Sequence, residues 1–241
     1  GGIIRRVKGT QKPEGTLEES AMFGPLFKVF AKIDSTGNIN IIRAGIESYI
    51  KYGFTTAQEG RASSAICESY KQLAAVGELP IDVYAYPDIQ MELPYMLKNG
   101  TQANYTNRFR IAGVKLSSDG AIQGKTAYLS QPYKVPPVGA KKDYRGYPAI
   151  PEESAYNAFI DSAFKHNWQI ITHCNGDASG DMYIKAVRLA ANKYGNENRR
   201  SVMIHAQMVR EDQLDSLKVL GIIPSFFAMH TFYWGDWHVS E

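Results

Sequence analysis

The stretch WQIITHCNGD, residues 168–177, decides most about this chain, because an apolar run typical of a β-strand ends there in His173. A second apolar run, SVMIHAQ (residues 201–207), repeats the pattern with His205. Runs of this kind are typical of strands in a parallel sheet that is covered on both faces. The carboxyl ends of such strands are where side chains converge on a ligand. We therefore expect the two histidines to face a common point.

A third strand-like run, IAGVKLSSDG (residues 111–120), carries Lys115 where an apolar residue would be expected. With His173 and His205 it predicts part of a metal site, because neutral imidazole is a good ligand for zinc and other divalent ions. Two alternatives stay open. Lys115 could instead form a Schiff base with a carbonyl substrate, as in barrel aldolases. A single histidine at a strand end is more often a structural, hydrogen-bonded residue than a ligand.

Strand-like and helix-like patterns alternate along most of the chain, and six strands can be counted. Strands separated by helices imply parallel pairing with right-handed crossovers, so the predicted fold class is α/β. A TIM-type (β/α)8 barrel is favoured over an open sheet, because no glycine-rich dinucleotide turn follows the first strand. A complete barrel has eight strands. We therefore expect an incomplete barrel with about six of its eight βα units.

The expected organisation is one partial barrel domain over residues 1–241. It would comprise an irregular N-terminal segment over residues 1–38 and βα units over residues 39–241. Within the βα units, residues 120–150 are rich in Gly, Pro and Tyr and predict a long loop. In barrels such loops carry function, so we expect it to border the active site. We expect no helix after the last strand-like segment.

Composition narrows the partners. The 27 basic and 24 acidic residues are mixed along the chain with a net charge of +3, which does not form the clustered basic face of a nucleic-acid-binding protein. The most apolar stretch is short and broken by Gly and Pro, so we expect no membrane span. The two cysteines are too few for a disulfide framework, which favours a reducing, cytoplasmic location.

Several motifs in one order resemble the YtcJ-like branch of the amidohydrolase superfamily, which includes N-substituted formamide deformylase. The match runs from about Gly1 to His238 through GFTTAQEG, GVKLSSDGAIQGKTAYLSQPY, THCNGDASGDMYIKA, IHAQMV and IPSFFAMHTFYWGDWH. This resemblance implies a TIM-barrel enzyme that hydrolyses C–N bonds other than peptide bonds, using metal-activated water. The partner would be a small amide- or formamide-like molecule.

The resemblance also implies roles for three residues. Lys115 matches the lysine of barrel strand four, which is often converted by CO2 into a carbamate that bridges two metals. His173 and His205 match the histidine ligands of strands five and six. The cofactor would be one or two divalent ions, with zinc expected. The family's His-x-His pair occurs nowhere in the sequence, and its general-base aspartate would lie beyond residue 241.

From this we expect a fragment covering barrel strands two to seven that is inactive alone, with no general base assigned to it. A barrel remnant that binds no metal is the alternative. Unpaired strands at its two edges would favour a homo-oligomer.

Four further residues are candidates for substrate binding: Asp119, Gln207, His230 and Trp234. Asp119 follows the strand of Lys115, and could instead fix the adjoining loop. The segment of His230 and Trp234 could instead be a packed aromatic loop without contact to substrate.

Overall fold

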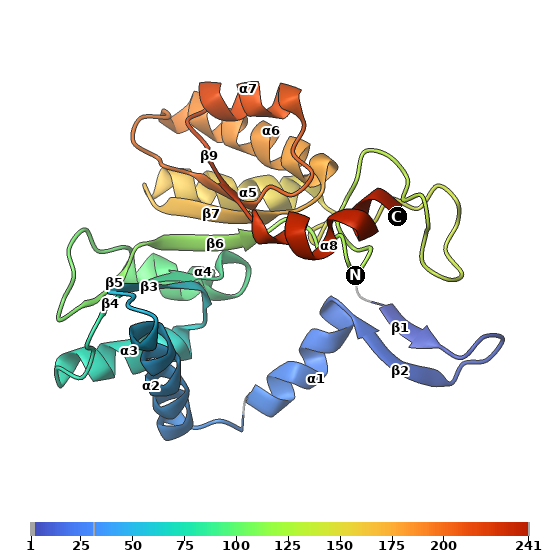
Figure 1. Ribbon diagram of the computed structural model, residues 1–241. Helices are drawn as coiled ribbons and strands as arrows, with labels where there is room; N and C mark the ends of the chain where they lie inside the picture. Colours follow the sequence, from blue (N-terminus) through green and yellow to red (C-terminus); the bar gives the residue numbers. More distant parts are fainter. Residues whose placement is uncertain (1–2, 31, 241) are drawn as a thin grey trace.

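The computed structural model describes residues 3–30 and 32–240. Its parallel strands form a three-stranded sheet in the order β3-β4-β5 and a four-stranded sheet in the order β6-β7-β8-β9, joined by helices (Figure 1). The strands are β1 (Ile3–Arg6), β2 (Pro13–Glu18), β3 (Thr56–Ala62), β4 (Asp82–Pro87), β5 (Phe109–Ile111), β6 (Gly113–Ser117), β7 (Gln169–Cys174), β8 (Val202–His205) and β9 (Ile223–Phe226). The helices are α1 (Ser20–Phe30), α2 (Ser35–Lys51), α3 (Ser64–Ala75), α4 (Ile89–Asn99), α5 (Glu153–Lys165), α6 (Asp177–Tyr194), α7 (Glu211–Val219) and α8 (Met229–Ser240).

The two parallel sheets meet at β5 and β6, which only Ala112 separates. Strand β4 pairs with β5, and beyond its end Asp88 forms a parallel bridge to Lys115 in β6. β5 and β6 therefore share one position in a curved wall of six βα units. Gly113, the first residue of β6, is closely approached by its neighbours: a Cβ there would meet the carbonyl group of Gln169 and lie 2.8 Å from a ring carbon of Tyr86. The predicted α/β fold, an incomplete (β/α)8 barrel, is confirmed.

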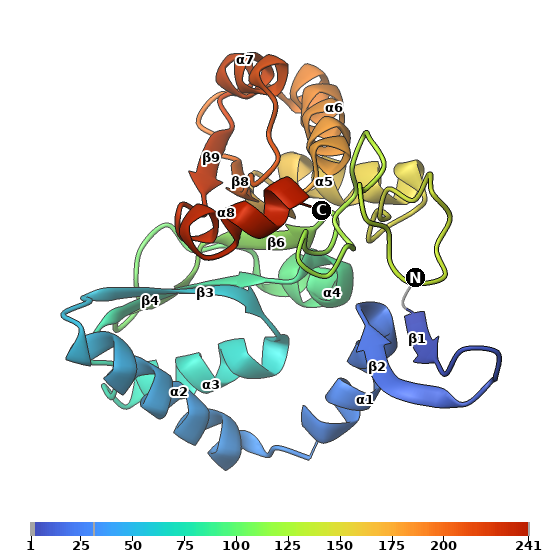
Figure 2. The ribbon, with the colours of Figure 1, turned by 45° about the vertical axis from the view of Figure 1, so that its right-hand side comes forward.

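Helices cover the outer side of this wall. α5, α6 and α7 lie over β6–β9, whereas α2 and α3 lie beside β3 and β4 (Figures 1 and 2). The largest fully buried side chains include Tyr156 and Phe164 of α5, Tyr183 of α6 and Ile170 of β7, all in one apolar core. Burying apolar surface stabilises the fold by about 25 cal/mol per Å². Because helices alternate with strands, the parallel strands all end at the same edge of the wall.

The N-terminal segment corrects one prediction. Residues 1–38 were expected to be irregular, but β1 and β2 form an antiparallel hairpin, with Ile4 opposite Leu17, and α1 follows. Most side chains of the hairpin face solvent, so the apolar alternation that marks a half-buried strand is weak. A guanidinium nitrogen of Arg5 donates to the carbonyl of Val138 at 3.2 Å, which ties the hairpin to the 120–150 loop.

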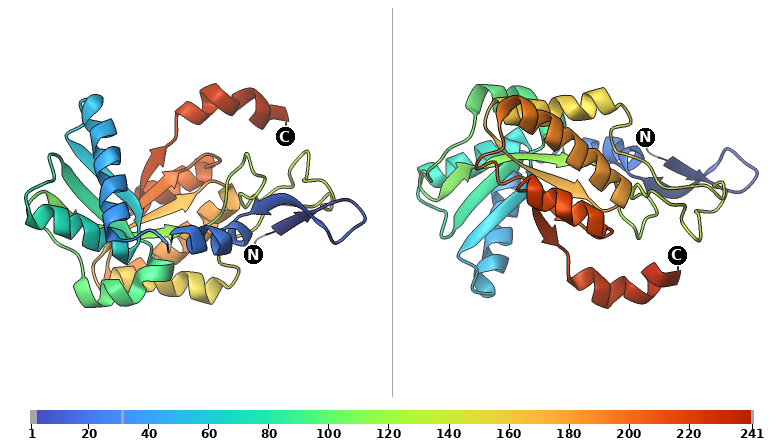
Figure 3. Two further views of the ribbon diagram at one scale, coloured as in Figure 1. Left: turned by 90° about the horizontal axis from the view of Figure 1, so that it is seen from below. Right: turned by 90° about the horizontal axis from the view of Figure 1, so that it is seen from above.

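The last segment corrects another prediction. No helix was expected after the final strand, yet α8 follows β9 and extends away from the other helices (Figure 3). None of its described residues is buried, and Phe232 is 82% exposed. An aromatic-rich helix without a buried face has no helical period of apolar residues to reveal it in the sequence.

The 120–150 loop contains no helix or strand, as predicted. A small cluster of Ile122, Ala127 and Tyr133 packs inside it, and Trp237 of α8 packs against that cluster. None of the described helices is both long and apolar enough to cross a membrane.

Candidate metal centre

The two predicted histidines lie side by side. His173 is the fifth residue of β7 and His205 the last of β8, and the strands pair in parallel with Cys174 opposite His205. The ring centroids are 4.7 Å apart and the rings meet edge to face, at 79°. His205 and the following Ala206 have φ of 73° and 47°. This left-handed backbone costs about 1–2 kcal/mol per residue, and such strain clusters at functional sites.

Lys115 completes the group from the neighbouring strand β6, where it lies opposite Ile171 of β7. It is only 6% exposed. Burial lowers the pKa of its ammonium group to about 8, because the charged form loses its hydration. The positive charge of Lys115 in turn contributes to the low pKa values of both histidines.

The hydrogen bonds of His173 define which ring nitrogen is free. Its Nε2 lies 2.9 Å from the carbonyl oxygen of Gly120. The side-chain amide nitrogen of Asn175 also lies 3.0 Å from Nε2. A carbonyl oxygen only accepts hydrogen bonds, whereas this amide nitrogen has the Gly120 carbonyl as an acceptor of its own, so the proton is assigned to Nε2 and the lone pair to Nδ1. The side-chain amide of Asn175 donates to the same carbonyl at 2.8 Å. A histidine held through one nitrogen, with the other unprotonated, is the usual arrangement of a metal ligand.

Both imidazoles are neutral at physiological pH. Burial, followed by the charge of Lys115, lowers the pKa of His173 to about 3 and that of His205 to about 4. The 3.6 Å separation between His173 Nε2 and Asp119 Oδ1 is therefore not an ion pair. Neutral imidazoles are the form that binds metal. In residues 3–30 and 32–240, no group of three or more His, Cys, Asp or Glu is placed to hold a metal ion. Two histidines, together with a lysine that CO2 can convert into a carbamate, thus fit part of the ligand set of a divalent metal ion.

Asp119 is an anchor for the backbone around the histidines. Its Oδ2 accepts hydrogen bonds from the amides of Tyr128 at 3.0 Å and Gly176 at 2.7 Å, and from the Ser179 hydroxyl at 2.9 Å. Its Oδ1 accepts from the amide of Asn175 at 3.0 Å. Burial raises the pKa of Asp119 to about 6, against the opposing effect of these donors. Its oxygens are engaged within the protein, which favours the loop-fixing alternative over substrate contact.

The sequence model of the amidohydrolase family matches residues 1–241 of the chain. The chain belongs to the amidohydrolase family. Two solved structures share its fold: an uncharacterized metal-dependent hydrolase from Pyrococcus horikoshii OT3, with a TM-score of 0.76 and 22% identity, and one from Pyrococcus furiosus, with a TM-score of 0.72 and 23% identity. No curated protein matches the sequence significantly.

The alignment covers nearly all of this amidohydrolase chain but only part of those structures. It includes 98% of the chain and 46% of the Pyrococcus horikoshii protein, and 92% of the chain and 45% of the Pyrococcus furiosus protein. The chain therefore spans less than half the length of the solved structures it matches.

The other predicted site residues of this amidohydrolase are placed differently. His230 is linked to His205 through Phe227, with successive ring centroids 6.0 Å apart. His230 Nδ1 and Gln207 Oε1 are both buried without a hydrogen-bond partner among the described residues. Trp234 is 39% exposed, and the ring it meets is Tyr233. Phe227 thus lies between His205 and His230, so His230 is near the histidine pair without contacting it through its ring. Trp234 lies at the surface.

Sequence reasoning missed two groups near the lysine and histidines. Asn175 contacts His173, and the THCNGD motif could have revealed it, since an amide two residues after a strand-end histidine is well placed to orient it. Asp88, 3% exposed, accepts from Nε of Arg61 at 2.7 Å beside the backbone of Lys115. No sequence signal marks that pair, because Arg61 of β3 and Asp88, which precedes α4, are far apart in the sequence.

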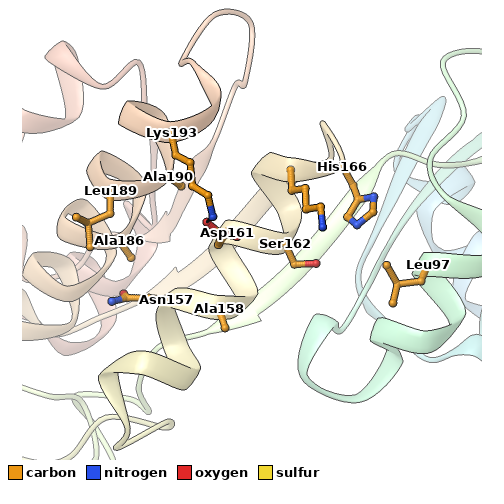
Figure 4. Close-up of a pocket in the computed structure, with 11 residues that line it drawn as sticks. Leu97, Asn157, Ala158, Asp161, Ser162, His166, Ala186, Leu189, Ala190 and Lys193 are labelled. Carbon is orange, nitrogen blue, oxygen red and sulfur yellow. Dashed lines mark hydrogen bonds and ion pairs between the residues drawn. The ribbon is translucent and has the colours of Figure 1, made fainter.

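A cavity of about 280 Å³ borders the same end of the sheet, lined by Ile122, Tyr133, Met208 and His238 among others. The 120–150 loop forms much of its wall, but none of the predicted metal-binding or substrate-binding residues lines it. A cavity of about 630 Å³ lies elsewhere, on the outer helices α5 and α6, where Asp161 and Lys193 form an ion pair at 2.9 Å (Figure 4). It contains none of the candidate site residues.

Proposed function

We propose that the chain is part of the catalytic barrel of a metal-dependent hydrolase acting on C–N bonds other than peptide bonds in small amide- or formamide-like molecules. The convergence of Lys115, His173 and His205 supports this most directly. Family membership supports hydrolysis, and the two similar solved structures are described as metal-dependent hydrolases. Because the chain spans less than half of those structures, the proposal concerns the whole enzyme.

In this proposal His173, through Nδ1, and His205 hold the divalent ion, with zinc the expected metal. A buried lysine whose pKa is lowered to about 8 is partly an uncharged amine near neutral pH, and such an amine reacts with CO2 to give a carbamate. The carbamate would replace the positive charge of Lys115 with an oxygen ligand. A divalent ion bound there supplies a Lewis acid that polarises a carbonyl group and activates water.

The protein's own groups position the ligands and the substrate. The carbonyl of Gly120 holds the ring of His173 through Nε2, and the Asp119 anchor holds the turn that follows β7. Gln207 and His230, each with a buried polar atom that has no hydrogen-bond partner among the residues the structure describes, are the favoured substrate contacts. A cytoplasmic location is part of the proposal, since both cysteines are unpaired and buried.

The deciding experiment is the metal content of the purified chain, measured by elemental mass spectrometry after incubation with zinc and bicarbonate. About one tightly bound ion per chain is expected. The double variant His173→Ala, His205→Ala should lose it. The matched control His166→Ala, altered at an exposed position at the end of α5, should retain it. Absence of bound metal in the unmodified chain, or equal binding by the double variant, would overturn the assigned site.

A second candidate function rests on the same buried lysine. An amine with a pKa lowered to about 8 also suits a Schiff-base nucleophile. Treatment with a small carbonyl compound such as pyruvate and borohydride would then add a fixed mass at Lys115, and chelators would have no effect. The hydrolase proposal predicts the reverse: no borohydride-trapped adduct and a loss of bound metal on chelation.

A further inference from the structure

A polar cavity of about 310 Å³ lies at the other end of the strands from the histidines. Gln169, the first residue of β7, lines it, as does Arg200, two residues before β8 begins. Arg110 of β5 and Arg199 also line the cavity. None of the described residues that line it carries a carboxylate. Three guanidinium groups thus border one small cavity without a neutralising acid in its wall.

Arg110 has unused hydrogen-bonding capacity. Its Nε is buried and has no hydrogen-bond partner in the described parts of the chain. Its Nη1 lies 3.4 Å from the carbonyl oxygens of Gln102 and Ala103, longer than a good N–H···O hydrogen bond. The rings of Tyr84 and Tyr105 flank the guanidinium, at 5.8 and 5.1 Å from their centroids. The aromatic rings hold the fork in place while leaving donors available.

Arg199 contributes a fixed positive charge. Its guanidinium donates to the carbonyl of Phe164 at 2.7 Å, at the end of α5, and to that of Tyr194 at 2.8 Å, at the end of α6. It stacks over the ring of Phe164 at 4.7 Å. These contacts satisfy carbonyl groups at the ends of two helices and hold the Arg199 guanidinium at the cavity wall.

Arg200 combines a fixed backbone with a free side chain. Its carbonyl accepts a hydrogen bond from Nε2 of Gln169 at 2.7 Å, and its φ is 48°, a left-handed conformation unfavourable for arginine. The Arg200 side chain is exposed and makes no hydrogen bond or ion pair with the described residues. The turn therefore places at the edge of the cavity a guanidinium group that makes no hydrogen bond with the described residues.

We propose that this cavity, which we call the arginine cavity, binds a small multivalent oxyanion, with Arg110 and Arg200 as its principal contacts. A guanidinium fork matches the oxygens of a phosphate or carboxylate in pairs, and a phosphate monoester or a polycarboxylate fits the volume. The site lies at the amino ends of β7 and β8, away from the histidine pair, so it is an accessory site. It does not depend on the hydrolase proposal.

The test is isothermal titration calorimetry of the chain, freed of metal with a chelator, against inorganic phosphate and against citrate at constant ionic strength. One binding event per chain is expected for at least one of them. The stronger ligand identifies the source, phosphate-bearing or polycarboxylate. The double variant Arg110→Gln, Arg200→Gln should weaken binding at least tenfold. Arg200→Gln alone, which removes no contact within the described residues, should weaken it at least threefold.

The matched control is Arg43→Gln, on the exposed surface of α2, where Arg43 pairs with Glu78. It removes the same charge and should leave binding unchanged. Two results would overturn the inference: neither anion binds the unmodified chain beyond the heat seen with chloride, or Arg43→Gln weakens binding as much as Arg200→Gln does. The second result would show attraction to net charge instead of a built site.

Discussion

Acidification is expected to destabilise the metal-free protein through His173. Burial lowers the pKa of the folded imidazole from 6.5 to about 3, so the folded state stays neutral as the pH falls. In the unfolded chain the same group takes up a proton below about pH 6.5. The unfolded state then binds more protons, so stability falls with falling pH. The stability that depends on a neutral His173 is fully present above about pH 6.5 and is lost progressively as the pH falls toward 3.

The size of the effect follows from the protonation of the unfolded state. At pH 5 the pH lies about 1.5 units below the pKa of the unfolded imidazole. Each unit corresponds to about 1.36 kcal/mol, so protonation lowers the free energy of the unfolded state by about 2 kcal/mol. The exact folded pKa matters little as long as it lies well below 5. The side chain of His173 is 22% exposed, so little of this is lost to solvent screening.

The assay is urea unfolding followed by tryptophan fluorescence, in a chelator, at pH 8 and pH 5. The comparison is His173→Gln, which cannot titrate but keeps an amide donor for the carbonyl of Gly120. Titration of Asp119 is common to both proteins and cancels in the difference. The stability of the parent relative to the variant should fall by about 2 kcal/mol between the two pH values. If the stability of the parent relative to the variant is the same at both pH values, or is higher at pH 5, the folded imidazole takes up a proton. The argument for a neutral ligand would then fail.

Three other perturbations test the structure. Gly176→Ala should lower the free energy of unfolding in urea by at least about 2 kcal/mol, because its Cβ would collide with the carbonyl of Tyr128. The control Gly45→Ala in α2, where a Cβ meets no atom within 4 Å, should be neutral or stabilising by up to about 1 kcal/mol. Equal effects of the two substitutions would contradict the packing. Arg210→Lys should lose about 1–2 kcal/mol, since one ammonium cannot hold the three carboxylates that its guanidinium binds, and an unchanged midpoint would refute this. Light scattering should show a homo-oligomer through the exposed edge strands, and Ile223→Lys on β9 should shift it toward monomer; a monomeric parent would refute it.

The sequence predicted the strands that carry the site, because buried parallel strands are continuous apolar runs. It placed His173 and His205 side by side for the same reason. It did not show that the strand of Lys115 is interrupted at Ala112, because the apolar run continues through that residue. The N-terminal hairpin and α8 were missed because their mostly exposed side chains leave no apolar period. Which nitrogen of His173 is free depends on the carbonyl of Gly120, a backbone contact that residue identity does not encode.

The contacts of Asp119 separate two parts of the long loop after β6. One carboxylate fixes the loop at Tyr128 and the turn after β7 at Asn175 and Gly176. The more distant part of the loop, around residues 134–143, lies beyond these bonds and is largely exposed. Insertions and substitutions there would leave the histidine geometry intact. The outer part of the loop can therefore vary among relatives of this chain, while the residues held by Asp119 stay constrained.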